Sequence, residues 1–408
     1  MKVAVTTLAF CITALLALGL VMLYSSSMVK AGTHDLMMQL VWCAAGFVLC
    51  AVAAALDYQW LNKAAWPIFG LALFLLLLVV VMGNHHVAGL STPRINGARR
   101  WLDFHGVRCQ PSEFAKLALV IILAWHGANC QRKMQTWKNG LILPGLFVGL
   151  MLGLIFIEPD RGTTILLAAV SGSMLFVAGI QWKHLLISAA LGATGLAVSI
   201  LRDPMRMGRI FAWLHPREQL NGAAVQSPHA MYGMSAGSID GNAALAAANQ
   251  AQHAMYGLGA GGVNGVGLGN GMQKFGYLPE IHTDFIFANI GEELGLIATL
   301  LVVIAFIVIA ICGIYIALNS RDTFGFLLAT GVTLLISLQA AINIGVVTSA
   351  LPNKGLPLPF ISYGGSNLLV MFACVGILFS VARLAPVRER KTGPLFEPSE
   401  NPFAAGVA

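Results

Sequence analysis

The chain has 408 residues, of which 57% are hydrophobic and only 10% are charged. Soluble domains carry about 25% charged residues, so a chain of this composition has too little polar surface to cover a globule in water. The composition excludes soluble, disordered, collagen-like and disulfide-scaffold proteins, and it predicts an integral membrane protein. The net charge of +7 is typical of cytoplasmic loops in such proteins, and no nucleic-acid-binding motif accompanies it.

The apolar runs predict an all-α polytopic membrane protein with about ten transmembrane helices, because each run is about long enough to cross a bilayer. The first run is too long for the core of a signal peptide, so we interpret it as an uncleaved helix. The run that begins at Asp284 is long enough to tilt or to start outside the membrane core. The predicted spans are Val3–Leu23, Leu36–Leu56, Trp66–Met82, Pro111–His126, Leu141–Ile157, Thr163–Ile180, His184–Leu201, Asp284–Leu318, Phe324–Ser349 and Ser366–Leu384.

The distribution of Lys and Arg predicts the orientation. With the N-terminus inside, eleven of the 24 cations fall on the cytoplasmic side and three in short outer loops, so both termini are expected to be cytoplasmic. Two long outer loops, 83–110 and 202–283, hold nine more cations. One explanation is that long loops cross the membrane regardless of charge. The other is an external site for an anionic ligand, such as a phosphate carried by a lipid.

The large loop before the eighth predicted helix contains a duplication. His-Ala-Met-Tyr-Gly occurs in both Gln226–Gly241 and Gln250–Gly265, at an offset of 24 residues. The small residues predict short amphipathic helices at the membrane surface. The glycines of Gly257–Asn270 form tight turns or present backbone N–H groups to a phosphate. We therefore expect one transmembrane domain over residues 1–384, including this loop, and a disordered cytoplasmic tail over 385–408.

Polar residues cluster at four places on the predicted outer side, where they are costly unless each has a partner or a purpose. In the last cluster, two prolines and paired glycines exclude a regular helix, which favours a re-entrant loop over an ordinary outer loop. The four clusters are Gln110–Lys116, Glu158–Gly162, Tyr277–Phe287 and Lys354–Ser366.

Each cluster has a structural explanation beside a functional one. Glu113 and Lys116 are three residues apart on one helix face, so they form a neutralising ion pair or line a polar cavity. Asp160 is placed to cap the following helix, and Thr283 or Asp284 could cap the next. The third cluster nevertheless holds more titratable groups than a cap requires.

The chemistry open to these clusters is narrow. The chain has no nucleotide-binding motif, no HExxH and no GxSxG. What remains is a carboxylate near a cationic, lipid-facing cavity. A carboxylate can act as general base on a hydroxyl, and cations can stabilise a pyrophosphate leaving group. Glycosyl transfer from a polyprenyl-pyrophosphate sugar needs both.

Taken together, these segments resemble the SEDS family of bacterial peptidoglycan polymerases, and within it the cell-division members. Each motif alone is modest, but the set keeps the family's order over most of the chain. Gly271 departs from the Ser that the family usually has there. The matching segments are Asn96–Trp101, Gln110–Lys116, Pro159–Gly162, Gly267–Lys274, Tyr277–Phe287, Gly291–Gly295 and Lys354–Ser366.

The resemblance implies a peptidoglycan glycosyltransferase that polymerises lipid II into β-1,4-linked glycan strands during septal wall synthesis. The family's essential aspartate matches Asp284, which we expect to deprotonate the acceptor 4-hydroxyl. Arg100, Lys116 and Lys274 are assigned to pyrophosphate binding. The substrate-binding positions implied are Arg100, Glu113, Lys116, Asp160, Lys274, His282, Lys354 and Ser362.

The resemblance also implies partners and a location. The expected partners are lipid II, a class B penicillin-binding protein of the FtsI type and the FtsQLB complex, at the septum of the bacterial cytoplasmic membrane. A divalent cation, Mg²⁺ or Mn²⁺, is implied as an aid to the reaction, although the sequence shows no dedicated metal site. The competing hypotheses are a lipid II flippase, an elongation-type polymerase and a non-catalytic scaffold of the division machinery.

Overall fold

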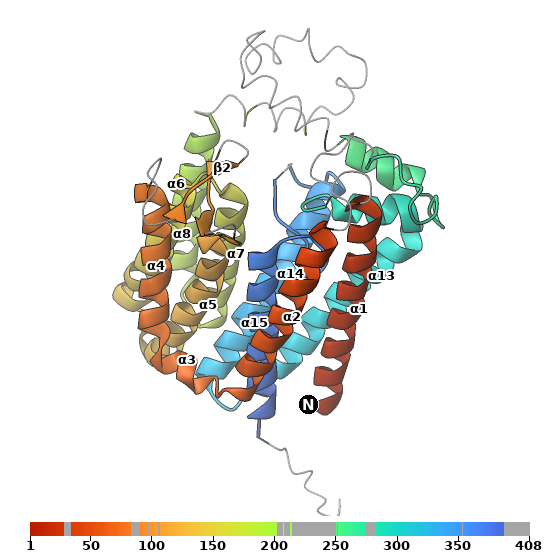
Figure 1. Cartoon of the computed structure of the whole chain (residues 1–408). Coiled ribbons are helices and arrows are strands. Elements are labelled where there is room, and N and C mark those ends of the chain that lie inside the picture. The colour runs from red at the N-terminus through yellow and green to blue at the C-terminus, as the bar shows by residue number, and fades with distance from the viewer. Residues whose placement is uncertain are drawn as a thin grey trace, which may run out of the picture.

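Apolar helices cross the computed structural model from end to end (Figure 1). Within the part of the chain that is described, nine helices are long and apolar enough to span a membrane, and the shorter α7 makes a tenth, which confirms the predicted architecture. The described residues are 1–27, 34–82, 90–95, 98–104, 107–201, 207, 213, 250, 252–274, 282–352 and 354–386.

The helix bounds follow the predicted spans closely. All ten runs are helical, and most differ by only a few residues at either end. The helices are α1 (Lys2–Ser27), α2 (His34–Ala55), α4 (Ala65–Met82), α5 (Pro111–Cys130), α6 (Leu143–Ile157), α7 (Arg161–Val177), α8 (Trp182–Leu201), α13 (Ile286–Leu318), α14 (Thr323–Val347) and α15 (Gly365–Arg383). Short elements are α3 (Gln59–Lys63), a 3₁₀ turn (Gln131–Lys133), a π-helical turn (Lys138–Ile142) that leads into α6, and a helix over 252–260.

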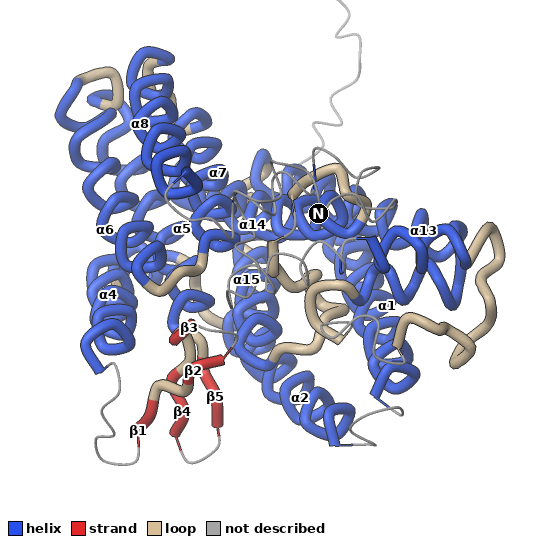
Figure 2. The backbone as a smooth tube through the Cα atoms, turned by 90° about the horizontal axis from the view of Figure 1, so that it is seen from above, coloured by secondary structure: helices blue, strands red, loops and turns tan. Residues whose placement is uncertain are grey.

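Three helices form the centre of the bundle. The apolar windows of α5, α14 and α15 are 72%, 61% and 78% buried, whereas that of α8 is only 6% buried. Helix α2 packs along α15, α1 along α13, and α5 lies between α4, α14 and α7. Helices α4 to α8 therefore gather on one side, and α1, α2 and α13 on the other (Figures 1 and 2).

Small antiparallel strands lie between α4 and α5, at the end of the bundle opposite the N-terminus (Figures 1 and 2). Three strands pair in the order β1–β4–β5, with Asp103 opposite Arg108, and β2 pairs with β3. This arrangement places Arg100 on the link between β3 and β4. The strands are β1 (Leu90–Ser91), β2 (Arg94–Ile95), β3 (Ala98–Arg99), β4 (Leu102–Phe104) and β5 (Val107–Cys109).

Four irregular connections meet at this same end of the bundle. They precede α5, α7, α13 and α15, and they contain the polar clusters that the sequence singled out. The segment before α15 has no regular secondary structure, yet Leu356, Leu358, Phe360 and Ser362 are buried in it. Irregular backbone covered by protein is the arrangement that a membrane tolerates, which supports the re-entrant interpretation.

Parts of the large loop and the tail lie outside the described residues. The first copy of the duplication, Gln226–Gly241, is among them, as is the tail from residue 387 onwards. The described part of the second copy is helical over 252–260 and then turns.

Candidate active site

The backbone at Asp284 is held by side chains from distant parts of the chain. Asn343 of α14 donates from Nδ2 to the carbonyl oxygen of Asp284 at 2.8 Å. The Ser362 hydroxyl donates to the carbonyl oxygen of Thr283 at 2.5 Å and accepts from the N–H of Leu358 at 2.8 Å. The predicted substrate-binding Ser362 thus fixes the segment that carries the predicted catalytic residue. Neither Thr283 nor Asp284 caps α13, whose N-cap residue is the next one, so that alternative is wrong.

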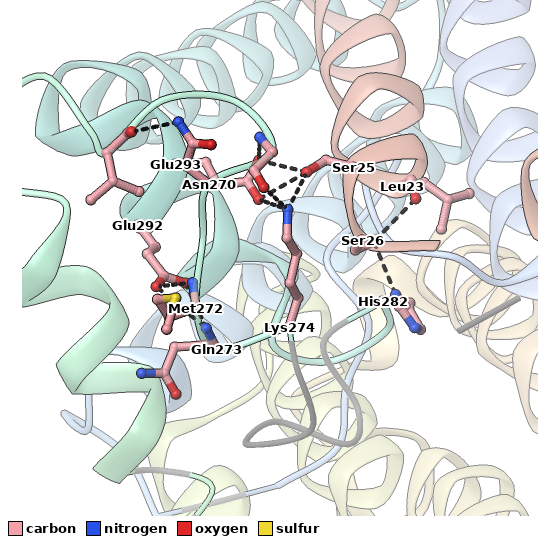
Figure 3. A network of polar contacts seen from close by, with 12 residues as sticks. Leu23, Ser25, Ser26, Asn270, Met272, Gln273, Lys274, His282, Glu292 and Glu293 are labelled. Atoms are coloured by element: carbon pink, nitrogen blue, oxygen red, sulfur yellow. Dashed lines mark hydrogen bonds and ion pairs between the residues drawn. The ribbon is translucent and has the colours of Figure 1, made fainter. Parts of the chain in front are cut away.

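The end of α1 holds the other side of the same segment. The Nδ1 atom of His282 lies 2.9 Å from the hydroxyl of Ser26 (Figure 3), and the N–H of Tyr363 donates to the His282 carbonyl at 3.0 Å. His282 is therefore bound through both its ring and its backbone. Residues 282–284 are clamped between α1, α14 and the segment before α15, which is the preorganisation that a general base requires.

A glycine separates Asp284 from the second polar cluster. A Cβ atom placed on Gly355 would overlap Oδ2 of Asp284, and a Cβ atom on Gly162 would lie 3.0 Å from the carbonyl oxygen of Gly355. The turn before α7 and the carboxylate of Asp284 are thus separated by one residue without a side chain. Lys354, directly before this glycine, is half-buried at the same place.

Several hydrogen bonds hold the turn before α7 around Asp160. Asp160 caps α7 by accepting from the N–H of Thr163 at 3.2 Å, which confirms the predicted cap. It also accepts from Gln110 at 3.2 Å. Arg100 donates to the carbonyl of Glu158 at 3.1 Å and to that of the following proline at 2.7 Å. The cation of the strand region is therefore anchored on this turn.

The Glu158 carboxyl in this turn was not predicted as a site residue. Its side chain is 2% exposed, and neither oxygen has a hydrogen-bond partner within the described structure. Burial, together with the neighbouring Asp160 carboxylate, raises the pKa of Glu158 to about 8, and Arg100 acts in the opposite direction. A buried acid without a hydrogen-bond partner, next to the Asp160 carboxylate and the Arg100 guanidinium, marks this turn as a candidate part of the functional site.

Glu113 and Lys116 form the buried ion pair that was one of the two alternatives. The Lys116 ammonium lies 2.6 Å from Glu113 Oε2 and donates to Gln339 Oε1 at 2.9 Å. Lys116 is fully buried, and Glu113 is 3% exposed. In this conformation the predicted pyrophosphate-binding ammonium points into the bundle.

Lys274 also forms a buried ion pair. Its ammonium lies 3.0 Å from Glu293 and donates to the Ser25 hydroxyl at 3.3 Å and to the Gly269 carbonyl at 2.5 Å (Figure 3). The Ser25 hydroxyl donates in turn to Glu293 at 2.7 Å. The end of α1 therefore contacts both this pair and, through Ser26, the Asp284 segment.

The glycine-rich segment 257–271 supplies hydrogen-bond partners to backbone groups at a break in α13. Gly295 has φ +76° and ψ −171°, which interrupts the helix and leaves two of its i to i−4 hydrogen bonds unmade. The segment replaces both with its own backbone groups. The four hydrogen bonds are Val266 N to Glu292 O and Gly267 N to Glu293 O, both 3.0 Å, Leu296 N to Gly262 O, 3.0 Å, and Ile297 N to Val263 O, 3.4 Å.

These glycines have positive φ at residues 262, 265, 267 and 269, as tight turns require. The N–H of Gly269 also donates to the Glu293 carboxylate at 3.0 Å. The N–H groups of residues 266, 267 and 269 are therefore used within the protein, which favours the turn explanation over a phosphate cradle.

Sequence comparison identifies the family. The family described as cell cycle protein, which comprises FtsW, RodA and SpoVE, matches residues 6–251 and 242–386. The chain belongs to the FtsW/RodA/SpoVE family. The SEDS resemblance is thereby confirmed. A probable peptidoglycan glycosyltransferase FtsW of Trichlorobacter lovleyi is 35% identical over 92% of this chain and 93% of that protein. Stage V sporulation protein E of Bacillus subtilis is 34% identical over 90% and 94%.

Solved structures share the fold. The rod shape determining protein RodA of Thermus thermophilus superimposes with a TM-score of 0.63 at 25% identity, covering 92% of this chain and 95% of that one. A chain from a peptidoglycan synthase complex, described as coordinating polymerization and crosslinking, gives a TM-score of 0.72 at 26% identity, covering 92% and 96%. The family fold therefore extends over nearly the whole chain.

Proposed function

We propose that this multi-pass membrane protein is a peptidoglycan glycosyltransferase that polymerises lipid II into β-1,4-linked glycan strands during septal wall synthesis. The observation that carries the proposal is the anchored backbone at Thr283 and Asp284, within the segment that resembles the family's catalytic motif, with the Asp284 carboxylate beside Gly355. Relatives named as FtsW glycosyltransferases match over nine tenths of the chain.

In the proposed reaction, Asp284 accepts the proton of the acceptor sugar's 4-hydroxyl. The oxygen then attacks the anomeric carbon of the donor, and the bond to the polyprenyl pyrophosphate breaks with its electron pair on the pyrophosphate. A general base contributes about 10²–10⁴-fold when it is correctly placed. Asn343 of α14, Ser26 of α1 and Ser362 of the irregular segment before α15 supply that placement by anchoring residues 282–284.

The leaving pyrophosphate needs nearby cations. Arg100 uses its Nε and one terminal nitrogen on the turn before α7, which leaves donors on the same guanidinium for a phosphate oxygen. Lys354, beside Gly355, is the second candidate. Lys116 and Lys274 are buried in ion pairs, so we assign them to maintaining the shape of the site.

A divalent cation remains a proposal without a defined place. The described residues contain no group of three or more His, Cys, Asp or Glu side chains that could hold a metal ion. The Asp160 oxygens accept from Thr163 and Gln110, and Glu113 is paired with Lys116. The steps given above therefore use only the chain's own groups.

We further propose that the protein works with a class B penicillin-binding protein and the FtsQLB complex. Support for a transpeptidase partner comes from the solved relative that belongs to a peptidoglycan synthase complex. Fluorescence microscopy of a tagged protein tests the location, because a side-wall pattern would point to the elongation role instead.

Purified protein, supplied with its transpeptidase partner and labelled lipid II, tests the activity. The wild type should produce glycan strands that a muramidase digests, and Asp284→Asn should abolish them while keeping the folded state. Absence of polymer from the wild type, or normal polymer from Asp284→Asn, would contradict the mechanism. Lipid II movement across vesicles without polymer would favour the flippase.

A further inference from the structure

Two amide side chains interrupt the apolar helix α14 close to the site. Gln339 and Asn343 are four residues apart, so they lie on one face of the helix, and they are 0% and 1% exposed. Polar groups in a membrane bundle are costly unless they are paired. Neither residue belongs to the motifs that resemble the family. Because neither side chain is exposed, the free-energy cost of burying the two amides must be offset by hydrogen bonds inside the protein.

Both amides hold backbone carbonyls of the irregular segment before α15. Asn343 donates to the Leu356 carbonyl at 2.6 Å as well as to that of Asp284, and Gln339 donates to the Pro357 carbonyl at 2.9 Å. Within the described part of the chain, these carbonyls accept no hydrogen bond from a helix or strand backbone. Because a buried backbone carbonyl is costly when it is left unsatisfied, the two amides determine where this segment lies.

The orientation of the Gln339 amide is fixed by Lys116. The ammonium can only donate, so the amide must present Oε1 to it and turn Nε2 towards Pro357 and Asn367. Glu113 holds the ammonium in place from the other side at 2.6 Å. A continuous chain of contacts therefore runs from the Glu113–Lys116 pair, through Gln339, to the segment that carries Gly355.

We propose that Gln339 and Asn343 are positioning residues for Asp284, and that Lys116 acts through Gln339 and not on the substrate. The inference rests on the proposed function and names residues that set its geometry. Asn343 ties Asp284 to the segment before α15, and Gln339 ties the same segment to α15 through Asn367 at 3.0 Å. Loss of either amide displaces the base relative to Gly355 without removing a group that touches lipid II.

The test compares variants of matched volume in the polymerase assay with the partner present. Gln339→Met, Asn343→Leu and Lys116→Met remove the contacts one at a time, and Lys116→Met/Gln339→Met removes two. Ser337→Ala is the control, because its hydroxyl lies on the same helix and has no hydrogen-bond partner within the described structure. Initial rates over a range of lipid II concentrations give kcat and KM separately, and thermal unfolding reports the fold.

Each single variant of the chain of contacts should lower kcat by about 10²-fold, the effect of a misplacement of about 1 Å, with KM changed by less than about twofold. The double variant should be no slower than the slower single variant, because both changes break the same connection. Ser337→Ala should match the wild type.

Two results would overturn the inference while leaving the proposed function intact. One is wild-type kcat in Gln339→Met and Asn343→Leu. The other is a tenfold or larger rise in KM for Lys116→Met, multiplied further in the double variant, which would mean that the ammonium binds lipid II directly. If Gln339→Met does not purify as a folded protein, the kcat and KM of Asn343→Leu, which leaves both buried ion pairs intact, decide the question. An inactive wild type would instead refute the proposed function.

Discussion

The substitution Gly355→Ala isolates the position of the proposed base. The added Cβ atom would overlap Asp284 Oδ2, at a separation well below the 3.0 Å that real Cβ atoms respect, and would lie 3.4 Å from Asp284 Cγ. Gly355 does not have positive φ, so alanine imposes no backbone strain there. The carboxylate is the flexible end of a side chain, so it can move aside at little cost in folding free energy.

The displacement that removes the overlap is roughly 1 Å, because ordinary contact between such atoms begins near 3.5 Å. A catalytic group misplaced by about 1 Å can cost about 10²-fold in rate. Among the described residues, and apart from those next to Gly355 in the chain, the methyl group would meet only Asp284 within 4 Å. We therefore expect kcat to fall by about 10²-fold, with KM for lipid II nearly unchanged and the unfolding temperature within about two degrees of the wild type.

Polymerisation of labelled lipid II by purified protein with its partner measures this effect. Gly145→Ala is the matched control, because its Cβ atom would meet nothing within 4 Å on α6. Equal kcat in Gly355→Ala and the wild type would show that Asp284 is not the base or that its position in the working enzyme differs from the one described.

Three further substitutions test other parts of the structure by thermal unfolding in detergent. The proton of Glu158 is released near pH 4.5 from the unfolded chain but near pH 8 from the folded one, so stability should fall as pH rises between these values. Glu158→Gln should remove that fall, and an unchanged pH dependence would contradict the raised pKa. Gly295→Ala should lower the unfolding temperature, because φ is positive and the Cβ atom would meet the glycine-rich segment, whereas Gly259→Ala should not. Lys274→Met should destabilise by roughly 3–5 kcal/mol by leaving a buried carboxylate unpaired, and adding Glu293→Gln should restore part of the loss.

Local patterns in the sequence predicted the elements well. Apolar runs of spanning length gave ten helices, since every backbone group in a membrane must be satisfied within a helix. The spacing of Glu113 and Lys116 offered an ion pair as one of two alternatives, and the structure has it; Asp160 caps α7, as its position before an apolar run suggested. All of these contacts lie within four residues of each other along the chain.

Contacts between distant segments could not be predicted in the same way. The sequence placed Lys274 and Lys116 near a substrate, but their partners include Ser25 and Gln339, which are over two hundred residues away. The polar character of Gln339 and Asn343 within an apolar run was the signal that could have marked them. The length of the run from Asp284 gave no sign of the break at Gly295.

The sequence by itself determined that this is an α-helical, multi-pass membrane protein of the SEDS family, because hydropathy and short motifs are properties of neighbouring residues. Only the tertiary structure decided which residues of these motifs lie next to one another and which serve to hold the fold. It showed that Gly355 separates Asp284 from the turn before α7, and that the backbone groups of the glycine-rich segment, one alternative for which was a phosphate site, complete the hydrogen bonds of a broken helix. The reason is that the position of a carboxylate depends on the anchors around it, and these come from helices far apart in the chain.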